Sequence, residues 1–207
     1  MIYAIIVAAA AYLIGSFNSS IVISRMVTGK DIRQSGSGNA GATNMLRTMG
    51  KKYAAITLII DVLKGVIAVL IARYINGGIE AMPYIAGLCV VLGHNFPIFF
   101  GFKGGKGVAT SLGVVMMLDW KVGLVVLAVA LLIMVTTRYV SLGSIVAAIV
   151  FAALEVAQMV MMGYVDIVKL ICVIALAALL IARHHENIGR LLSGTENKLG
   201  AKKEKSR

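Results

Sequence analysis

Residues 1–15, MIYAIIVAAAAYLIG, decide the fold class because they form a long apolar run without a single charged side chain. No basic residue precedes this run, and the first positive charges follow it at Arg25 and Lys30. A cleaved signal peptide carries its positive charge before the apolar run. We therefore expect a retained membrane span whose N-terminus lies outside.

The composition of the 207-residue chain supports a membrane protein. Hydrophobic residues make up 59% of the chain and charged residues only 14%, whereas about a quarter of a typical soluble domain is charged. No polar stretch approaches the size of a soluble domain. The sequence therefore predicts one membrane-embedded domain over residues 1–207, which ends in a solvated basic tail over about residues 197–207.

The apolar runs predict an all-α integral membrane protein, a bundle of seven transmembrane helices. A helical span needs about 17–25 apolar residues. One of the runs, 107–119, is short, so it is either tilted or a half-helix that other helices screen from lipid. The predicted spans are 2–24, 53–74, 81–100, 107–119, 121–137, 140–161 and 164–183.

The distribution of positive charge sets the predicted orientation. The net charge is +11, and all but four of the 20 lysines and arginines lie in segments that this span order places inside. This asymmetry is typical of cytoplasmic loops and predicts an outside N-terminus and a cytoplasmic C-terminus. Because the basic residues follow topology and few aromatic residues accompany them, we do not expect a nucleic-acid partner. The four exceptions are Lys64, Arg73, Lys121 and Lys169.

The stretch GSGNAGATNMLR, residues 36–47, is the first candidate site for a phosphate group. Glycine permits positive φ, so Gly36, Gly38 and Gly41 would let consecutive N–H groups point to one centre. The guanidinium of Arg47 would hold a phosphate bidentately. An ordinary glycine-rich interfacial loop is the alternative. The candidate substrate-binding residues here are Ser37, Gly38, Asn39, Gly41, Thr43, Asn44 and Arg47.

The stretch FKGGKG, residues 102–107, repeats this pattern just before an apolar helix. Lys103 and Lys106 flank Gly104 and Gly105, and the helix that starts after Gly107 would add its positive N-terminus. The alternative is a loop whose lysines only set the topology. Two such stretches on one membrane face predict a phosphorylated substrate, or two of them.

Two further polar stretches lie on the same predicted face. In RHHENIGRLLSGTE, residues 183–196, His184 and Asn187 would share a helical face. Histidine can transfer a proton near neutral pH, and asparagine can orient a hydroxyl or stabilise an oxyanion. The alternative is an amphipathic helix that faces lipid headgroups. In RYVSLGS, residues 138–144, Ser141 and Ser144 would add hydroxyls to the pocket or cap a helix.

We predict neither a metal site nor a proton pathway. The two neighbouring histidines diverge on a helix, and no carboxylate has the spacing that would support metal binding. Asp61 and Lys64 stand three residues apart within a predicted span, so they can neutralise each other. We interpret them as a structural ion pair that supports Arg47. A proton pathway is the alternative, but no further acidic residues line up with this pair.

These stretches resemble the signature segments of the bacterial acyl-phosphate:glycerol-3-phosphate acyltransferases. The resemblance is carried by GSGNAGATNMLR (36–47), GHNFPIFFGFKGGKGVATSLG (93–113) and RHHENIGRLLSGTENKLG (183–200). It implies a seven-span enzyme of the bacterial cytoplasmic membrane with its active site facing the cytoplasm. The enzyme would transfer a fatty acyl group from acyl phosphate to the 1-hydroxyl of sn-glycerol 3-phosphate, giving lysophosphatidic acid and phosphate. No cofactor would be required, and we expect a monomer in the lipid bilayer.

A transporter or channel for an organic phosphate is the rival from another functional class. It would share the membrane and the phosphate sites but would need alternating access, and the sequence shows neither internal repeats nor a polar cluster on the outer side. Formation of a labelled lipid from acyl phosphate and glycerol 3-phosphate would indicate an enzyme. Uptake of the phosphate into vesicles without a product would indicate a transporter.

Overall fold

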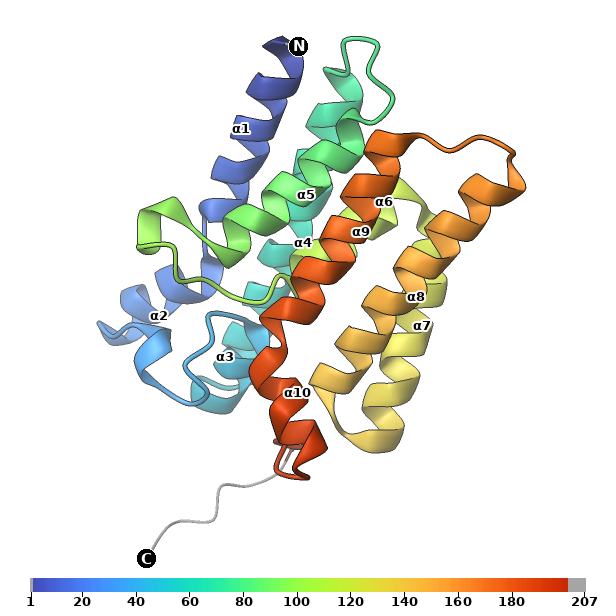
Figure 1. Ribbon diagram of the computed structural model, residues 1–207. Helices are drawn as coiled ribbons and strands as arrows, with labels where there is room; N and C mark the ends of the chain where they lie inside the picture. The colour runs from blue at the N-terminus through green and yellow to red at the C-terminus, as the bar shows by residue number, and fades with distance from the viewer. Residues whose placement is uncertain (1, 201–207) are drawn as a thin grey trace, which may run out of the picture.

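The computed structural model describes residues 2–200, and every regular element in this range is helical. The predicted basic tail beyond residue 200 lies outside the described residues. Figure 1 shows long helices that run side by side, with several shorter ones at one end. The elements are α1 (Ile2–Ser16), α2 (Ser19–Thr28), η1 (Ile32–Gln34), α3 (Ala42–Thr48), α4 (Lys51–Tyr74), α5 (Met82–Asn95), η2 (Ile98–Phe100), α6 (Val108–Leu118), α7 (Trp120–Thr137), α8 (Val140–Met161), α9 (Ile167–Arg183) and α10 (His185–Leu192).

The apolar helices lie where the sequence predicts them. Five stretches are long and apolar enough to cross a membrane: α1 with α2, α4, α5 with η2, α7 and α8. A sixth is added if α9 and α10, which are bent by 57°, form one span. The predicted span 107–119 becomes α6, a shorter apolar helix. The all-helical class is therefore confirmed, while the count of seven crossings and the orientation of the termini stay predictions.

Carboxylates mark the starts of two long helices. The side chain of Asp119 accepts hydrogen bonds from the backbone N–H groups of Lys121 (2.8 Å) and Val122 (3.1 Å) at the start of α7. Asp166 does the same at the start of α9. Such caps satisfy N–H groups that have no partner within the helix. These acidic residues therefore define helix ends and lie outside the helices that they begin.

Glycine lets the helices on one side of the bundle touch backbone to backbone. A Cβ atom added to Gly15 of α1 would lie 2.0 Å from the carbonyl oxygen of Val90 on α5. One added to Gly93 of α5 would lie 2.1 Å from the carbonyl oxygen of Tyr12 on α1. Gly65 of α4 approaches α6 in the same way. Small residues at helix contacts are typical of membrane bundles, and they make α1, α4, α5 and α6 a tightly packed frame.

The predicted ion pair between Asp61 and Lys64 is confirmed, but its surroundings differ from the prediction. The Lys64 Nζ atom lies 3.0 Å from Asp61 Oδ1. Asp61 also accepts a hydrogen bond from Ser19 (2.9 Å), and Lys64 lies 2.7 Å from His94 Nδ1. The pair does not support Arg47, because the residues that contact it lie on α1, α2, the link between them and α5. Arg47 lies on α3 with an exposed side chain.

The polar stretches converge at one end of the bundle. In Figure 1, α2, α3, α10 and the turn between α7 and α8 lie at the end opposite to the start of α1. The segment that links α5 to α6 reaches the same region, since Arg183 at the end of α9 donates hydrogen bonds to the carbonyl of Gly105 (3.2 and 3.3 Å). The fold therefore joins four stretches that are far apart in the sequence.

Candidate active site

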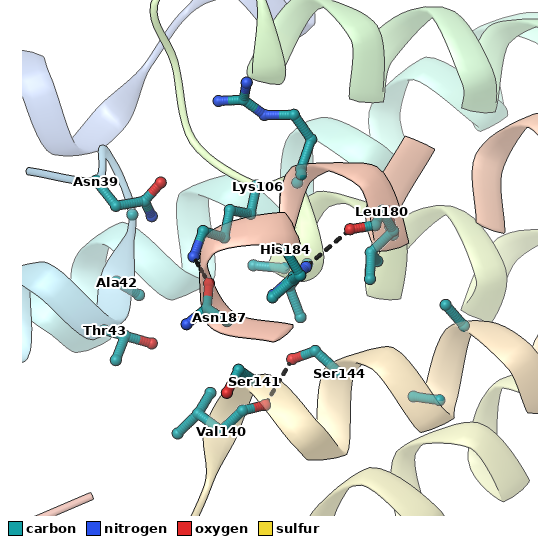
Figure 2. Close-up of a pocket in the computed structure, with 18 of the residues that line it drawn as sticks. Asn39, Ala42, Thr43, Lys106, Val140, Ser141, Ser144, Leu180, His184 and Asn187 are labelled. Carbon is teal, nitrogen blue, oxygen red and sulfur yellow. Dashed lines mark hydrogen bonds between the residues drawn. The ribbon is translucent and has the colours of Figure 1, made fainter. Parts of the chain in front are cut away.

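One cavity of about 930 Å³ joins the polar stretches to the interior of the helix bundle. Every predicted site residue except Gly105 lines this cavity. Figure 2 shows Asn39 and Thr43 on one side of the cavity, with Lys106, His184, Asn187 and Ser141 on the others. The convergence of the predicted residues on a single space is the main result that the structure adds to the sequence.

The loop at 36–44 adopts only part of the predicted backbone conformation. Gly36 and Gly38 have φ angles of 63° and 72°, as expected. The prediction of positive φ at Gly41 is wrong: its φ is −167°, an extended conformation that any residue can adopt, and it directly precedes α3. Two glycines, not three, are therefore required by the backbone conformation of this loop.

The loop uses some of the N–H groups of the predicted phosphate cradle itself, so these are not available to a phosphate. The Ser37 N–H donates to the side chain of Asn44 (2.9 Å), and the Gly38 N–H donates to the carbonyl of Ser35 (3.1 Å). The amide nitrogen of Asn44 donates to the carbonyls of Ile32 (3.2 Å) and Ser35 (3.0 Å). Asn44 therefore holds the loop in shape and is not free to serve as the substrate donor that we expected.

The glycines of the second loop serve close packing. The Gly104 and Gly105 N–H groups donate to the carbonyls of Asn95 and His94 at the end of α5, each at 3.1 Å. A Cβ atom at Gly104 would lie 2.0 Å from the His94 carbonyl oxygen, and one at Gly105 would lie 2.3 Å from that of Ala40. Both N–H groups are thus occupied, and the absence of a side chain lets this loop reach the end of α5 and the 36–44 loop.

Arg33 ties these two loops together. Its guanidinium donates to the carbonyls of Phe100 (2.8 Å) and Lys103 (2.7 Å) and forms an ion pair with Asp31 (2.8 Å). The hydrogen bonds from Arg33 lower the pKa of Asp31, so that carboxylate stays ionised and keeps Arg33 in place. The positions of the loops relative to each other are therefore fixed by a charged clamp.

Glu196 organises the opposite wall of the cavity. It accepts hydrogen bonds from the Asn187 amide (2.7 Å), the Ser141 hydroxyl (2.8 Å) and the Arg190 guanidinium (2.8 Å). With its NH₂ group turned to Glu196, Asn187 presents its amide oxygen to Lys106, which donates a hydrogen bond to it (Figure 2). A chain of contacts thus runs from α8 through the C-terminal segment to α10 and the second loop.

This network sets the charge state of its members. Burial lowers the pKa of Lys106, and the charge of Arg190 lowers it further. Burial raises the pKa of Glu196, but the hydrogen bonds from Asn187, Arg190 and Ser141 outweigh this effect and lower it. Glu196 is therefore ionised at neutral pH. Within residues 2–200, no three His, Cys, Asp or Glu side chains are grouped to bind a metal ion.

His184 occupies the bend between α9 and α10. Its Nδ1 lies 2.8 Å from the carbonyl oxygen of Leu180, which can only accept, so Nδ1 carries the proton. Burial lowers the pKa of His184 to about 4, and the charge of Lys106 contributes to this shift. The neutral ring therefore has a free lone pair on Nε2 for a donor in the cavity.

Two cations at the mouth of the cavity have no partner in the part of the chain that the structure describes. The side chains of Arg47 and Lys103 line the cavity and are exposed, and neither makes a hydrogen bond or ion pair with another described residue. Both charges are available to an anion that enters from water. The hydroxyls of Ser37 and Thr43 line the same side of the cavity.

The other end of the cavity is apolar. Along α8 the lining continues from Ser141 to Phe151, ten residues further, which corresponds to about 15 Å of helix. Phe151 is only 3% exposed. The remaining wall consists mainly of aliphatic side chains from α6, α7 and α9. They are Leu112, Val115, Val126, Leu127, Ala130, Leu131, Met134, Leu176, Ala177 and Leu180.

The chain also matches known proteins over nearly its whole length. A family model described as glycerol-3-phosphate acyltransferase matches residues 5–194. The chain belongs to the glycerol-3-phosphate acyltransferase family. The curated glycerol-3-phosphate acyltransferase of Thermoanaerobacter sp. (strain X514) is 49% identical over 202 residues, which are 98% of each chain. That of Clostridioides difficile (strain 630) is 46% identical over 204 residues, 97% of each.

Two solved structures resemble this acyltransferase in fold. Both are crystal structures of PlsY (YgiH), an integral membrane glycerol 3-phosphate acyltransferase, and both are 45% identical in sequence. The glycerol 3-phosphate form has a TM-score of 0.85 and covers 95% of this chain and 96% of its own. The lysophosphatidic acid form has a TM-score of 0.81 and covers 95% of both.

Among the polar residues of this acyltransferase site that were not predicted, three hold other parts of the site in place. Arg33 and Arg183 hold the segment that links α5 to α6 through its backbone carbonyls, and Glu196 holds Asn187. Glu196 had a signal in the sequence, because it is the acidic residue that closes the polar stretch 183–196. Arg183 opens the same stretch, but its partner could not be predicted, because it is a backbone atom 78 residues away. Arg33 had no signal, and its partner is a backbone atom 70 residues away.

Proposed function

We propose that this enzyme transfers a fatty acyl group from acyl phosphate to the 1-hydroxyl of sn-glycerol 3-phosphate, releasing lysophosphatidic acid and inorganic phosphate. One observation carries the proposal: a single cavity has a basic, hydrogen-bonding mouth at one end. Its other end, the apolar arm, is lined by the aliphatic side chains of α6, α7 and α9 and by Phe151. Such a space suits a reaction between a water-soluble phosphate ester and an acyl chain. The PlsY structures in glycerol 3-phosphate and lysophosphatidic acid forms support the same assignment.

The basic residues of the mouth would bind the phosphate groups. Arg47 and Lys103 supply charges that have no partner in the described part of the chain, and Lys106 lines the same cavity. Ser37 and Thr43 add hydroxyl donors. Hydrogen bonds between charged groups are stronger than those between neutral groups. They would hold the substrates and would also offset the negative charge that grows in the transition state. Gly38, Asn39, Gly104 and Gly107 complete the walls around these groups.

The reaction needs no covalent intermediate on the protein. The glycerol 3-phosphate oxygen would form a bond to the acyl carbon, the bond from that carbon to the phosphate oxygen would break, and the hydroxyl proton would leave with the phosphate. With a pKa of about 4, His184 is a weak base at neutral pH, so it suits orienting the hydroxyl at Nε2. Asn187 and Ser141, held by Glu196, would position the reacting groups, and Ser144 borders the acyl chain.

We also propose that the chain is one domain of seven spans in the bacterial cytoplasmic membrane, monomeric, with the N-terminus outside and the site facing the cytoplasm. The grouping of the site at the end rich in lysine and arginine supports this placement. A tag at residue 207 should be protected in right-side-out vesicles, and a tag at residue 1 should be accessible. Reversed accessibility would refute this orientation.

The reaction itself is tested with purified enzyme, acyl phosphate and labelled glycerol 3-phosphate in detergent or vesicles. We expect labelled lysophosphatidic acid and one phosphate released for each acyl group transferred. Folded protein that forms no labelled lipid, or that only moves the label across vesicles, would overturn the proposal. Omitting the acyl phosphate serves as the control.

The role of His184 has its own test. His184→Gln should chiefly raise the KM for glycerol 3-phosphate, and the pH profile of kcat should keep its shape. A dedicated histidine base would contribute about 10²–10⁴-fold to kcat. If His184→Gln removes a basic limb that the wild-type pH profile of kcat shows, and leaves KM unchanged, His184 is the base.

A further inference from the structure

A buried charged cluster lies behind the second loop and has no part in the reaction described above. Asp61, Lys64 and His94 are 2%, 4% and 3% exposed. Lys64 contacts Asp61 (3.0 Å) and the carbonyls of Gly15 (3.2 Å) and Phe17 (3.1 Å). Ionisable groups inside a membrane bundle are costly, and they usually serve function.

The contacts of this cluster fix the position of the proton on His94. The Lys64 ammonium, paired with the Asp61 carboxylate, can only donate hydrogen bonds. Its Nζ lies 2.7 Å from His94 Nδ1, so that nitrogen is the acceptor. The proton of the neutral ring therefore lies on Nε2, and the Lys64 charge makes this N–H a stronger donor.

The Nε2 atom lies where the two loops of the mouth meet. A Cβ atom at Gly105 would be 2.2 Å from His94 Nε2 and 2.3 Å from the carbonyl oxygen of Ala40. His94 lines the cavity together with Asp61. Nε2 forms no hydrogen bond to any residue between 2 and 200. Because His94 lines the cavity, an acceptor that enters the cavity can reach this N–H group.

We propose that His94 is a further phosphate-binding residue, whose Nε2–H donates a hydrogen bond to a phosphate oxygen held between the 36–44 and 103–107 loops. The inference rests on the proposed function, because that reaction supplies the phosphate. Lys64 and Asp61 are positioning residues that keep the proton on Nε2. The phosphate belongs either to glycerol 3-phosphate or to the acyl phosphate, and both present the same acceptor oxygens.

Two matched substitutions test the two sides of the ring separately. In His94→Gln the amide NH₂ can take the place of Nε2–H, while the acceptor for Lys64 is lost. In His94→Asn the amide oxygen can take the place of Nδ1, while the donor toward the cavity is lost. We expect His94→Gln to stay within a few-fold of wild type and His94→Asn to raise a KM about 10- to 100-fold.

The KM is measured separately for glycerol 3-phosphate and for acyl phosphate, and the one that rises identifies the source of the phosphate. The opposite order, with His94→Asn unchanged and His94→Gln impaired, would overturn the proposal and leave His94 as an acceptor for Lys64 alone. Equal behaviour of the two variants would also overturn it. If the wild-type enzyme makes no labelled lysophosphatidic acid in this assay, the proposed function fails instead.

Folding of the two variants is checked by their unfolding temperature in detergent. If both fail to fold, a second measurement on the wild-type enzyme tests the proposal. The wild-type enzyme is labelled with ¹⁵N-histidine, and the signal of His94 is assigned with substitutions at the other two histidines. Saturating glycerol 3-phosphate or acyl phosphate should shift the His94 Nε2–H signal. An unchanged signal with both substrates would overturn the proposal.

Discussion

The two ends of the cavity are built in different ways. At the mouth, specific partners hold several of the functional side chains: Glu196 fixes Asn187, and Asn187 fixes Lys106. In the apolar arm, Val126 and Leu176 are held only by packing against other buried apolar residues. The function of the mouth therefore depends on the positions of its hydrogen-bonding groups, whereas the function of the arm depends on its volume. Apolar walls tolerate exchanges that keep their volume, but a hydrogen-bonded network does not tolerate the loss of one member.

The largest effect is expected at Arg47, one of the two cations at the mouth without a partner among residues 2–200. Arg47→Ala should weaken binding of the transition state by about 2–5 kcal/mol, the cost of removing one member of a desolvated charge pair. Arg47→Lys should recover only part of this loss, because it lacks the bidentate geometry. The measurement is kcat/KM for folded enzyme. Normal kinetics in Arg47→Ala would show that Arg47 does not bind the substrate phosphate.

Gly105→Ala should have the next largest effect, although Gly105 does not line the cavity. The added Cβ would lie 2.2 Å from His94 Nε2 and 2.3 Å from the Ala40 carbonyl oxygen, so the second loop must move. A displacement of about 1 Å can cost about 100-fold in rate. Gly101→Ala tests a glycine of the same segment with no atom within 4 Å of a new Cβ, although its φ of 67° adds local strain. Activity retained in Gly105→Ala would show that the mouth tolerates movement.

Glu196→Gln should lower kcat/KM about tenfold, because hydrogen bonds to a charged group are worth about 1.5–3 kcal/mol and only part of them is lost. Gln keeps an oxygen for Ser141 but loses the ion pair with Arg190. A larger change in kcat than in KM would indicate misplaced reacting groups. Unchanged kinetics would show that Asn187 keeps its orientation without the carboxylate.

The same variant gives a test by pH. The pKa of Glu196 is lowered below its ordinary 4.5, so the unfolded chain binds the proton more readily than the folded one. The stabilisation by this carboxylate is therefore complete above about pH 4.5 and is lost as the pH falls through the folded-state pKa. Thermal unfolding of wild type should show this loss, and Glu196→Gln should show less of it. Identical pH dependence would contradict the network.

The smallest effect is expected in the arm. Phe151→Ala should enlarge its inner end and favour longer acyl chains, by about 0.8 kcal/mol for each additional buried CH₂ group. The measurement is the ratio of kcat/KM for two acyl phosphates that differ in chain length. Leu132→Ala, at a 65% exposed position on α7, is the matched control and should leave the ratio unchanged. An unchanged ratio in Phe151→Ala would show that the chain does not reach this residue.

The apolar runs and the charge pattern predict the helices, and the long polar motifs predict most of the residues that line the cavity. The span predicted at 140–161 coincides with α8, and the stretch 36–47 lies against the cavity as expected. These features are local, because hydrophobic runs and glycine-rich loops reveal themselves within a few residues. The gathering of the polar stretches also follows from the span order, which places them at one end.

The exact use of each polar group could not be predicted, because it depends on contacts between distant segments. Lys106 meets Asn187 across 81 residues of sequence. Glycine in a loop signals either positive φ or close packing, and only the structure shows that Gly105 serves packing. Asn44 likewise looks like a substrate donor until its three loop contacts are seen. The sequence therefore predicts which residues belong to the site, whereas the hydrogen-bond partner of each residue depends on the tertiary structure.

The continuity of mouth and arm has a consequence for the direction of lipid synthesis. On the proposed function, glycerol 3-phosphate enters from water, but the product carries an acyl chain that already lies in the arm. Each CH₂ group kept out of water favours the bilayer by about 0.8 kcal/mol, so the product partitions into the membrane and not back into solution. The cavity therefore favours one direction of transfer, in which a water-soluble glycerol phosphate becomes a lipid that stays in the membrane.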